Sequence, residues 1–236
     1  MSQPITNYQP ITNYQHQSDI DSIKRLPAGK VVCIGRNYAA HAKELGNPVP
    51  KQPVIFIKPS TSLCHWNEKV YIPAGLGECH HEVELAILIK ERLTNLDETD
   101  DVVSAIAGVS LALDLTLRDL QQTLKSQGHP WEMAKAFDGA CPVANWIELP
   151  SAKWLEQAEF SLSINGELRQ TASAQLMLWP VIELIRYISQ TFTLQPGDMV
   201  LTGTPEGVAA LQPGDKLQAS LSDLLTITSK VESYGG

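Results

Sequence analysis

The chain has 236 residues, of which 43% are hydrophobic, enough for the core of one large domain. Its formal net charge of -8 argues against nucleic acid and anionic membranes as main partners. The four cysteines form no Cys-x-x-Cys pair, and the sequence shows no signal peptide or long apolar run, so we expect free thiols in a cytoplasmic protein.

The chain begins with a short tandem repeat. Pro-Ile-Thr-Asn-Tyr-Gln occupies residues 4–9 and again residues 10–15. A single duplication of six residues is too short for a solenoid. We therefore predict a flexible N-terminal arm over residues 1–17, without chemistry, followed by one domain over residues 18–236.

Two short apolar stretches predict buried strands on either side of a helix. Residues 30–35 and 53–59 are apolar, and prolines bound the second stretch. Lys58, near the end of that stretch, either faces solvent or contacts an anion. Residues 39–45 between the strands are good helix formers, and a Gly-Asn-Pro sequence ends them.

The predicted helix carries a histidine and an acid on one face. His41 and Glu44 are three residues apart, so their side chains are neighbours on a helix. A carboxylate beside an imidazole orients the ring and raises its basicity, which suits a general base. An ordinary surface pair would have the same spacing, so both interpretations remain open.

The stretch Cys-His-His-Glu-Val-Glu-Leu-Ala-Ile-Leu at residues 79–88 combines two acids with an apolar run. Side chains alternate along a strand, so Glu82 and Glu84 share one face. Two carboxylates on a buried face repel each other and are costly to desolvate. Either a hard divalent cation neutralises them or they lie at a solvated strand end. The adjacent cysteine and histidines match no common zinc module.

A third acid follows the next apolar strand. Asp114 stands between residues 109–113 and a predicted helix over residues 116–125. An acid at such a junction is often only a helix cap, but it is also a natural third oxygen ligand. On the helix, Arg118 and Gln121 share a face.

Lys135 lies among small residues in a mostly apolar stretch. A buried lysine needs a charged partner or a role in the chemistry, whereas an exposed lysine needs neither. Position in the sequence alone leaves this choice open.

The C-terminal half predicts strands joined by tight turns. Asn165-Gly166 between two strand-like stretches is typical of a hairpin with a type I′ turn. Residues 176–190 have the spacing of a helix, in which Pro180 fits only near the first turn. Leu-Gln-Pro-Gly-Asp occurs at residues 194–198 and 211–215, each time before a strand. The whole pattern predicts a mainly β fold with a few short helices, of the α+β class.

Taken together, these phrases resemble the fumarylacetoacetate hydrolase (FAH) family, most closely its single-domain, acylpyruvase-like branch. The matching phrases are residues 35–44, 56–60, 80–84, 114–121, 135–137 and 197–207. They occur in the family's order between about residues 30 and 229. The resemblance implies a mixed β-sandwich roll over the domain at residues 18–236, and usually a homodimer.

The resemblance also implies roles for individual residues. It implies that Glu82, Glu84 and Asp114 bind Mg²⁺ or Mn²⁺, that His41 and Glu44 form a catalytic dyad on a lid helix with Lys135 as active-site lysine, and that Arg118, Gln121 and Thr204 contact substrate, as would Arg36 and Lys58.

The activity that this resemblance implies is hydrolysis of a C–C bond in acylpyruvates, small 2,4-dioxo acids of the fumarylpyruvate type, to pyruvate and a carboxylic acid. The dyad favours hydrolysis, because it would take a proton from an attacking water. The same site would also suit an oxaloacetate decarboxylase or tautomerase, or a 2-hydroxydienoate isomerase or decarboxylase. A non-catalytic Ca²⁺-binding β protein is a more distant alternative, since it leaves the dyad and Lys135 without a purpose.

Overall fold

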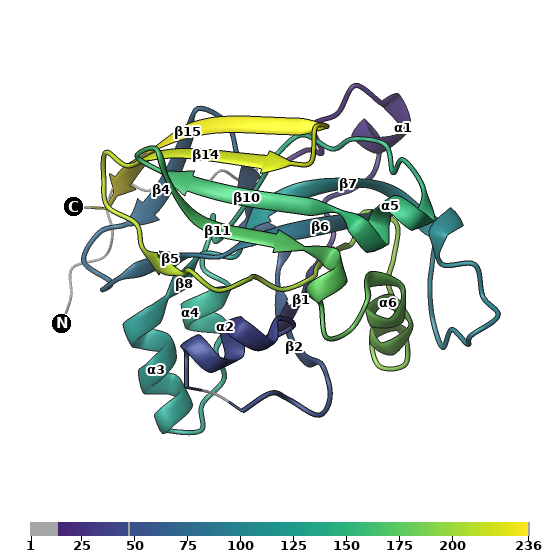
Figure 1. Ribbon diagram of the computed structural model, residues 1–236, viewed down its shortest axis with the longest axis horizontal. Coiled ribbons are helices and arrows are strands. Elements are labelled where there is room, and N and C mark those ends of the chain that lie inside the picture. The colour runs from purple at the N-terminus through teal and green to yellow at the C-terminus, as the bar shows by residue number, and fades with distance from the viewer. Residues whose placement is uncertain (1–13, 47, 236) are drawn as a thin grey trace.

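The computed structural model describes residues 14–46 and 48–235 (Figure 1). Its largest sheet has, in spatial order, strands β2 (Val54–Lys58), β1 (Val31–Gly35), β12 (Met199–Leu201), β6 (Val83–Ile89), β7 (Ile106–Leu113), β9 (Cys141–Val143) and β3 (Leu63–His65). A second sheet has β11 (Glu167–Ser173), β10 (Glu159–Ile164), β14 (Lys216–Leu221), β15 (Leu225–Tyr234) and β4 (Lys69–Pro73). A small third sheet has β13 (Ala209–Ala210), β5 (Cys79–His81) and β8 (Thr116–Leu117).

The helices are short and lie around the sheets. They are α1 (Asp21–Lys24), α2 (Ala39–Glu44), α3 (Arg118–Ser126), α4 (Glu132–Lys135), α5 (Ala152–Gln157) and α6 (Val181–Ser189), with 3₁₀ turns η1 (Ser60–Ser62), η2 (Val103–Ala105) and η3 (Ala174–Leu176). Figure 1 shows α2, α3 and α4 together at one end of the molecule, with α6 at the other. Among the described residues, no helix is both long enough and apolar enough to cross a bilayer. The predicted mainly β fold with short helices is confirmed.

Strand β6 is buried on both faces, which explains its continuous apolar sequence. Val83 and Leu85 belong to the large apolar core that includes side chains of β10, β14 and α6. Ala86 and Leu88 point the other way, into a second core with residues of β1 and β12. The alternation predicted from the sequence is therefore present, with a packed layer on each side of the strand.

The predicted hairpin is also present. Strands β10 and β11 are antiparallel, and Asn165 and Gly166 between them have φ values of 55° and 85°. Two positive φ values in a two-residue loop define the type I′ turn. The two Leu-Gln-Pro-Gly-Asp phrases serve different sheets, because the first precedes β12 and the second precedes β14.

The helix predicted over residues 176–190 begins later than expected. Residues Ala174–Leu176 form a 3₁₀ turn, and α6 starts only at Val181, directly after Pro180. Proline disfavours a helical conformation at the residue before it, so the helix cannot extend through Trp179. The sequence therefore predicted this helix correctly but placed its beginning too early.

Most of the predicted N-terminal arm, residues 1–13, lies outside the described residues. Two later residues of the predicted arm pack against the domain. Tyr14 and His16 are both buried. The Tyr14 ring centroid lies 4.9 Å from that of His65, and the His16 centroid lies 5.8 Å from that of Trp146. These two residues therefore belong to the packed structure.

Candidate active site

Three acids meet at one end of the β6–β7 hairpin. Glu82 directly precedes β6, Glu84 is the second residue of that strand, and Asp114 follows β7. The Asp114 amide donates a 2.8 Å hydrogen bond to the carbonyl of Glu82, which closes the end of the hairpin. One carboxylate oxygen from each acid lies within 4.8 Å of the others. All three residues are at most 5% exposed, which a solvated strand end would not be.

Cationic side chains surround two of the three carboxylates. Lys135 Nζ lies 2.8 Å from Glu82 Oε2 and 2.6 Å from Asp114 Oδ2. The Arg118 guanidinium donates to Glu82 Oε1. Lys58 Nζ lies 2.8 Å from Asp114 Oδ1. Lys135 is thus a buried lysine with two partners, which resolves the choice that the sequence left open.

These contacts and the burial of the site shift the pKa values of neighbouring groups. Burial alone would raise the pKa of Glu82, but Lys135 and Arg118 outweigh it and hold that pKa well below its usual range. Burial alone would lower the pKa of Lys135, but Asp114 and Glu82 raise it above its usual value. Burial, together with the charges of Asp114 and Glu82, raises the pKa of Glu84 well above its usual range.

Glu84 shows why this cluster fits a divalent cation. Among the described residues its carboxylate forms no ion pair, and its hydrogen bond comes from the Gly203 amide at 2.6 Å. A buried carboxylate beside two others needs positive charge to remain ionised. The donor set is entirely carboxylate oxygen, which hard cations such as Mg²⁺ and Mn²⁺ prefer.

The His–Glu pair lies beside the acids. His41, on α2, is 4% exposed, and its Nδ1 lies 3.2 Å from Glu44 Oε2. The other oxygen of Glu44 accepts a 2.9 Å hydrogen bond from the amide of Gly207. A loop 163 residues further along the chain therefore holds the carboxylate that orients the imidazole.

A cavity of about 50 Å³ connects these groups. Its wall includes His41 and the three acids, together with Lys135 and the predicted substrate contacts Arg36, Arg118, Gln121 and Thr204. Of the predicted site residues, only Glu44 and Lys58 do not line it. A larger open groove of about 690 Å³ runs beside β4 and β15, but Glu68 is the only acid in its wall.

Lys58 is the one predicted substrate contact that the structure places elsewhere. Its side chain is fully buried behind Asp114. Besides that carboxylate, its ammonium binds backbone carbonyls, including those of Lys135 and, at 3.2 Å, Ala140. The anion that Lys58 contacts is therefore part of the protein. In the structure Lys58 pairs with Asp114 and does not line the cavity.

The residues of the cavity wall that sequence reasoning missed include two aromatic side chains and a lysine. Phe56 and Trp131 pack with ring centroids 6.2 Å apart, and Lys125 Nζ lies 5.9 Å from the Trp131 ring. Lys125 was detectable in the sequence, because it follows Arg118 by seven residues. That spacing is two helical turns, which places both side chains on the same face of α3.

A buried glutamine of the second sheet forms hydrogen bonds with two segments of the site. Gln170 on β11 accepts a 3.0 Å hydrogen bond from the Val83 amide and donates a 2.8 Å bond to Thr204 Oγ1. Thr204 in turn donates to the Val83 carbonyl at 2.9 Å. The loop that carries Thr204 is thereby fixed against the start of β6.

The fold and the site define a class of protein, an α+β enzyme in which a cluster of carboxylates suited to a divalent cation and a histidine paired with a glutamate lie at one cavity. The sequence model of the fumarylacetoacetate (FAA) hydrolase C-terminal domain matches residues 30–232. The chain belongs to the fumarylacetoacetate hydrolase family. It is 47% identical over 220 residues to oxaloacetate tautomerase YcgM of Escherichia coli (strain K12), covering 92% of this chain and 99% of that protein.

Solved structures agree with this assignment. A fumarylacetoacetate hydrolase family protein from Yersinia pestis CO92 is 48% identical, with a TM-score of 0.88 over 92% of this chain and all of that one. Fumarylpyruvate hydrolase from Pseudomonas aeruginosa, solved in complex with Mn²⁺ and pyruvate, is 32% identical. Its TM-score is 0.86, with 96% of this chain and 98% of that chain covered.

Proposed function

We propose that this protein is an oxaloacetate tautomerase, which interconverts the enol and keto forms of that 2-oxo dicarboxylic acid. The observation that carries the proposal is that buried His41, paired with the exposed Glu44, lines the same cavity as the three acids. Tautomerisation moves one proton between carbon and oxygen and needs no attacking water. The 47% identity to an oxaloacetate tautomerase over nearly its whole length supports this reaction over the others.

The carboxylate cluster would hold the cation that such a reaction uses. Glu82, Glu84 and Asp114 would bind Mg²⁺ or Mn²⁺, which when bound supplies a Lewis acid beside the 2-oxo acid group. The ammonium of Lys135 lies against the carboxylates of Glu82 and Asp114 and offsets their negative charge.

The His41–Glu44 dyad would transfer the proton. In the neutral ring, Nδ1–H of His41 donates to Glu44, so Nε2 is the nitrogen with a free lone pair. That nitrogen would take the proton from C3 of the keto form and deliver it to the C2 oxygen, and it would move the proton from oxygen to C3 in the reverse direction. Glu44 stabilises the imidazolium that exists between these steps, and the Gly207 amide keeps Glu44 in position.

Hydrolysis of acylpyruvates is the second candidate. It is supported by the likeness of nearly the whole chain to the fumarylpyruvate hydrolase of Pseudomonas aeruginosa. In that reaction His41 would activate a water for attack on the distal carbonyl, and Lys135 would offset the charge of the leaving enolate. The two reactions share every residue of the site and differ in whether water reaches the substrate.

One set of assays separates the candidates. Purified protein with Mg²⁺ is mixed with enol oxaloacetate, and the loss of enol absorbance is followed with the keto product trapped by malate dehydrogenase. The same protein is given fumarylpyruvate and acetylpyruvate, and pyruvate is measured. We expect kcat/KM for tautomerisation to exceed that for either hydrolysis by about 100-fold or more. The opposite order would assign the protein as a hydrolase, and release of CO₂ from oxaloacetate as a decarboxylase.

A further inference from the structure

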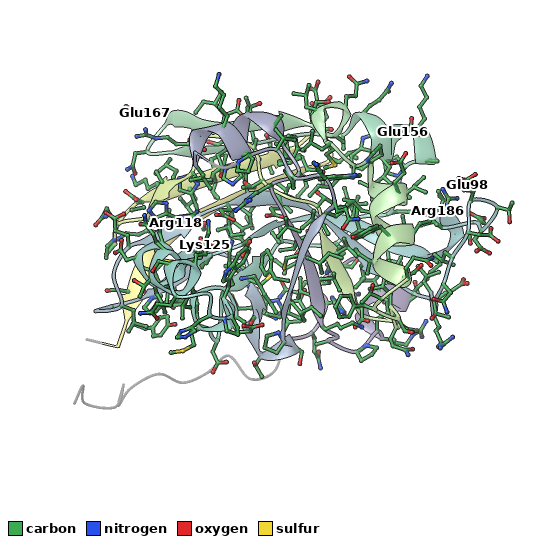
Figure 2. All side chains as sticks on the ribbon, turned by 90° about the horizontal axis from the view of Figure 1, so that it is seen from below. Glu98, Arg118, Lys125, Glu156, Glu167 and Arg186 are labelled. Atoms are coloured by element: carbon green, nitrogen blue, oxygen red, sulfur yellow. The ribbon has the colours of Figure 1, made fainter. Side chains whose placement is uncertain are left out.

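Three cationic side chains besides Lys135 line the cavity. Arg118 and Lys125 come from successive turns of α3, and Arg36 comes from the residue after β1. All three line the cavity that contains the acids. Figure 2 shows Arg118 and Lys125 next to each other, at the opposite end of the molecule from Glu98 and Arg186.

Two of these three cations have no acidic partner. Arg118 is occupied, because it binds Glu82 and donates a 2.7 Å hydrogen bond to Gln121. Within residues 14–46 and 48–235, neither Arg36 nor Lys125 forms an ion pair. The Nζ of Lys125 lies over the face of the Trp131 ring, 5.9 Å from its centroid.

The two unpaired cations also repel each other. Partial burial, followed by the charges of Arg36 and Arg118, lowers the pKa of Lys125. Arg36 has a φ value of 61°, a left-handed conformation that is uncommon for a residue other than glycine. Unfavourable charge and backbone geometry at one place are typical of a binding site that is completed by its ligand.

The local charge contrasts with that of the whole chain. The chain has a net charge of -8, yet the cavity wall has four cationic side chains against three acids. A divalent cation on the acids would raise this positive excess further. A ligand with a single carboxylate at the metal would leave Arg36 and Lys125 unneutralised, whereas the second carboxylate of a dianion would offset their charge.

We propose that Arg36 and Lys125 form a subsite for the second carboxylate of a 2-oxo dicarboxylic acid, the end remote from the three acids. The guanidinium supplies paired donors to one carboxylate, and the ammonium supplies a second charge held against Trp131. This inference rests on the proposed function for the binding of the 2-oxo acid end. It makes these two residues the ones that select dicarboxylates over monocarboxylic 2-oxo acids.

The test compares two ligands that differ at one group. Oxaloacetate and 2-oxobutyrate share the 2-oxo acid end, and only oxaloacetate carries a second carboxylate. Binding of each to the Mg²⁺-loaded protein is measured by calorimetry for the wild type, Lys125→Met and Arg36→Gln. Methionine keeps an apolar stem against Trp131 while removing the charge. Lys153→Met is the matched control, because Lys153 is exposed on α5 and outside the cavity.

We expect each cavity variant to bind oxaloacetate about tenfold more weakly, the effect of losing one charge-assisted hydrogen bond. Binding of 2-oxobutyrate should not change, and KM for oxaloacetate should rise while kcat is maintained. Equal weakening of both ligands, or no weakening of either, would overturn the subsite. Failure of the proposed function would look different: the wild type would prefer oxaloacetate to 2-oxobutyrate and yet not tautomerise it.

Discussion

Lys58 and Asp114 form an ion pair in the interior of the protein, with 2.8 Å between Nζ and Oδ1 and neither side chain more than 2% exposed. The remaining capacity of the ammonium is filled by backbone carbonyls of the segment that follows Asp114. Removing either member of a buried ion pair is destabilising, because the charge that remains is strongly disfavoured in the protein interior.

Replacing Lys58 should therefore cost stability even though it does not touch the substrate cavity. We expect Lys58→Met to lose about 3–5 kcal/mol in the free energy of unfolding, measured with urea in the presence of a chelator. Lys24→Met is the control, because Lys24 forms an exposed pair with Asp21 at 3.1 Å and should cost at most about 0.5 kcal/mol. Equal stabilities for the two variants would show that the buried pair contributes nothing.

The dyad should affect turnover and leave the cation site intact. We expect His41→Asn and Glu44→Gln each to lower kcat by about 10²–10⁴, the usual range for one positioned acid–base group. Mn²⁺ affinity should be unchanged, because neither residue belongs to the carboxylate cluster. Glu78→Gln is a suitable control, since Glu78 pairs with His80 at 3.0 Å outside the cavity. Near wild-type turnover in His41→Asn would remove the dyad from the mechanism.

Glu84 should show opposite effects with and without metal. In a chelator, Glu84→Gln should be at least as stable as the wild type, because a glutamine needs neither a buried charge nor the uptake of a proton on folding. With Mn²⁺ at 100 times its Kd, the wild type gains about 2.7 kcal/mol, and the variant should gain much less. Thermal unfolding with and without Mn²⁺ measures both effects, and exposed Glu156→Gln should behave as the wild type. Full Mn²⁺ stabilisation of Glu84→Gln would exclude Glu84 as a ligand.

Gly207 is needed both for its backbone conformation and for the space it leaves. It has a φ value of 95°, and an added Cβ would lie 1.9 Å from the carbonyl oxygen of Arg169. Gly214 has a φ value of 99° with nothing within 4 Å of an added Cβ, so it controls for the conformation alone. We expect Gly214→Ala to cost about 1–2 kcal/mol and to leave kcat unchanged.

Gly207→Ala should cost more than Gly214→Ala and should also lower kcat. The reason is that the loop must move away from Arg169, which breaks the hydrogen bond from the Gly207 amide to Glu44. Urea unfolding and steady-state kinetics on both variants make the comparison. Identical behaviour of the two alanine variants would mean that this loop tolerates displacement without loss of the dyad.

His16 should make stability depend on pH. Its pKa is lowered from 6.5, chiefly by burial, and its Nε2 lies 3.0 Å from the carbonyl of Pro27. Above pH 6.5 the ring is neutral in both the folded and unfolded states, so it adds no pH dependence. As pH falls below that value the unfolded chain takes up a proton that the folded protein does not, and stability is lost.

The variant His16→Gln should reduce that slope by up to about 1.4 kcal/mol per pH unit, the value for one proton. Unfolding free energies measured between pH 7 and pH 5 provide the comparison. Replacing the exposed His129 by Gln should leave the wild-type slope unchanged. A slope in His16→Gln equal to that of the wild type would indicate that His16 is protonated in the folded protein.

Local sequence patterns predicted the parts of the site that lie on single elements. The two-residue period of β6 placed Glu82 and Glu84 on one face, and the helical period placed His41 beside Glu44. The position of Asp114 at a strand end also followed from the sequence. Each of these inferences needed only neighbours within a few residues.

Contacts between distant segments could not be predicted in this way. Gln170 looks like a solvent-facing residue of a hairpin strand, yet it is 1% exposed, while Leu168 is 62% exposed. The register of β10 and β11 shifts between these positions, since Ser163 pairs with Leu168 and Leu162 pairs with Gln170. The bulge reverses the faces of β11, and no hydrophobic period reveals it.

The order of the candidate reactions changed for a related reason. The residue types of the site favour any chemistry that passes through an enolate, and the dyad favoured hydrolysis when only the sequence was considered. Because two relatives are named oxaloacetate tautomerases, we rank proton transfer without an attacking water first among the candidate reactions. Access of water depends on the shape of the cavity, which is set by segments far apart in the chain.

The hydrogen bonds of Gln170 have a consequence for protein engineering. The three carboxylates come from one β-hairpin, which suggests a unit that could be transplanted into another scaffold. The side chains that surround these carboxylates would not be transplanted with the hairpin. Lys58 comes from β2, Lys135 comes from α4, and Gln170, which accepts the hydrogen bond of the Val83 amide, comes from β11. A grafted hairpin would carry three like charges without the groups that make them tolerable. The smallest unit that could be transplanted with the site intact is therefore the pair of whole sheets together with the interface between them.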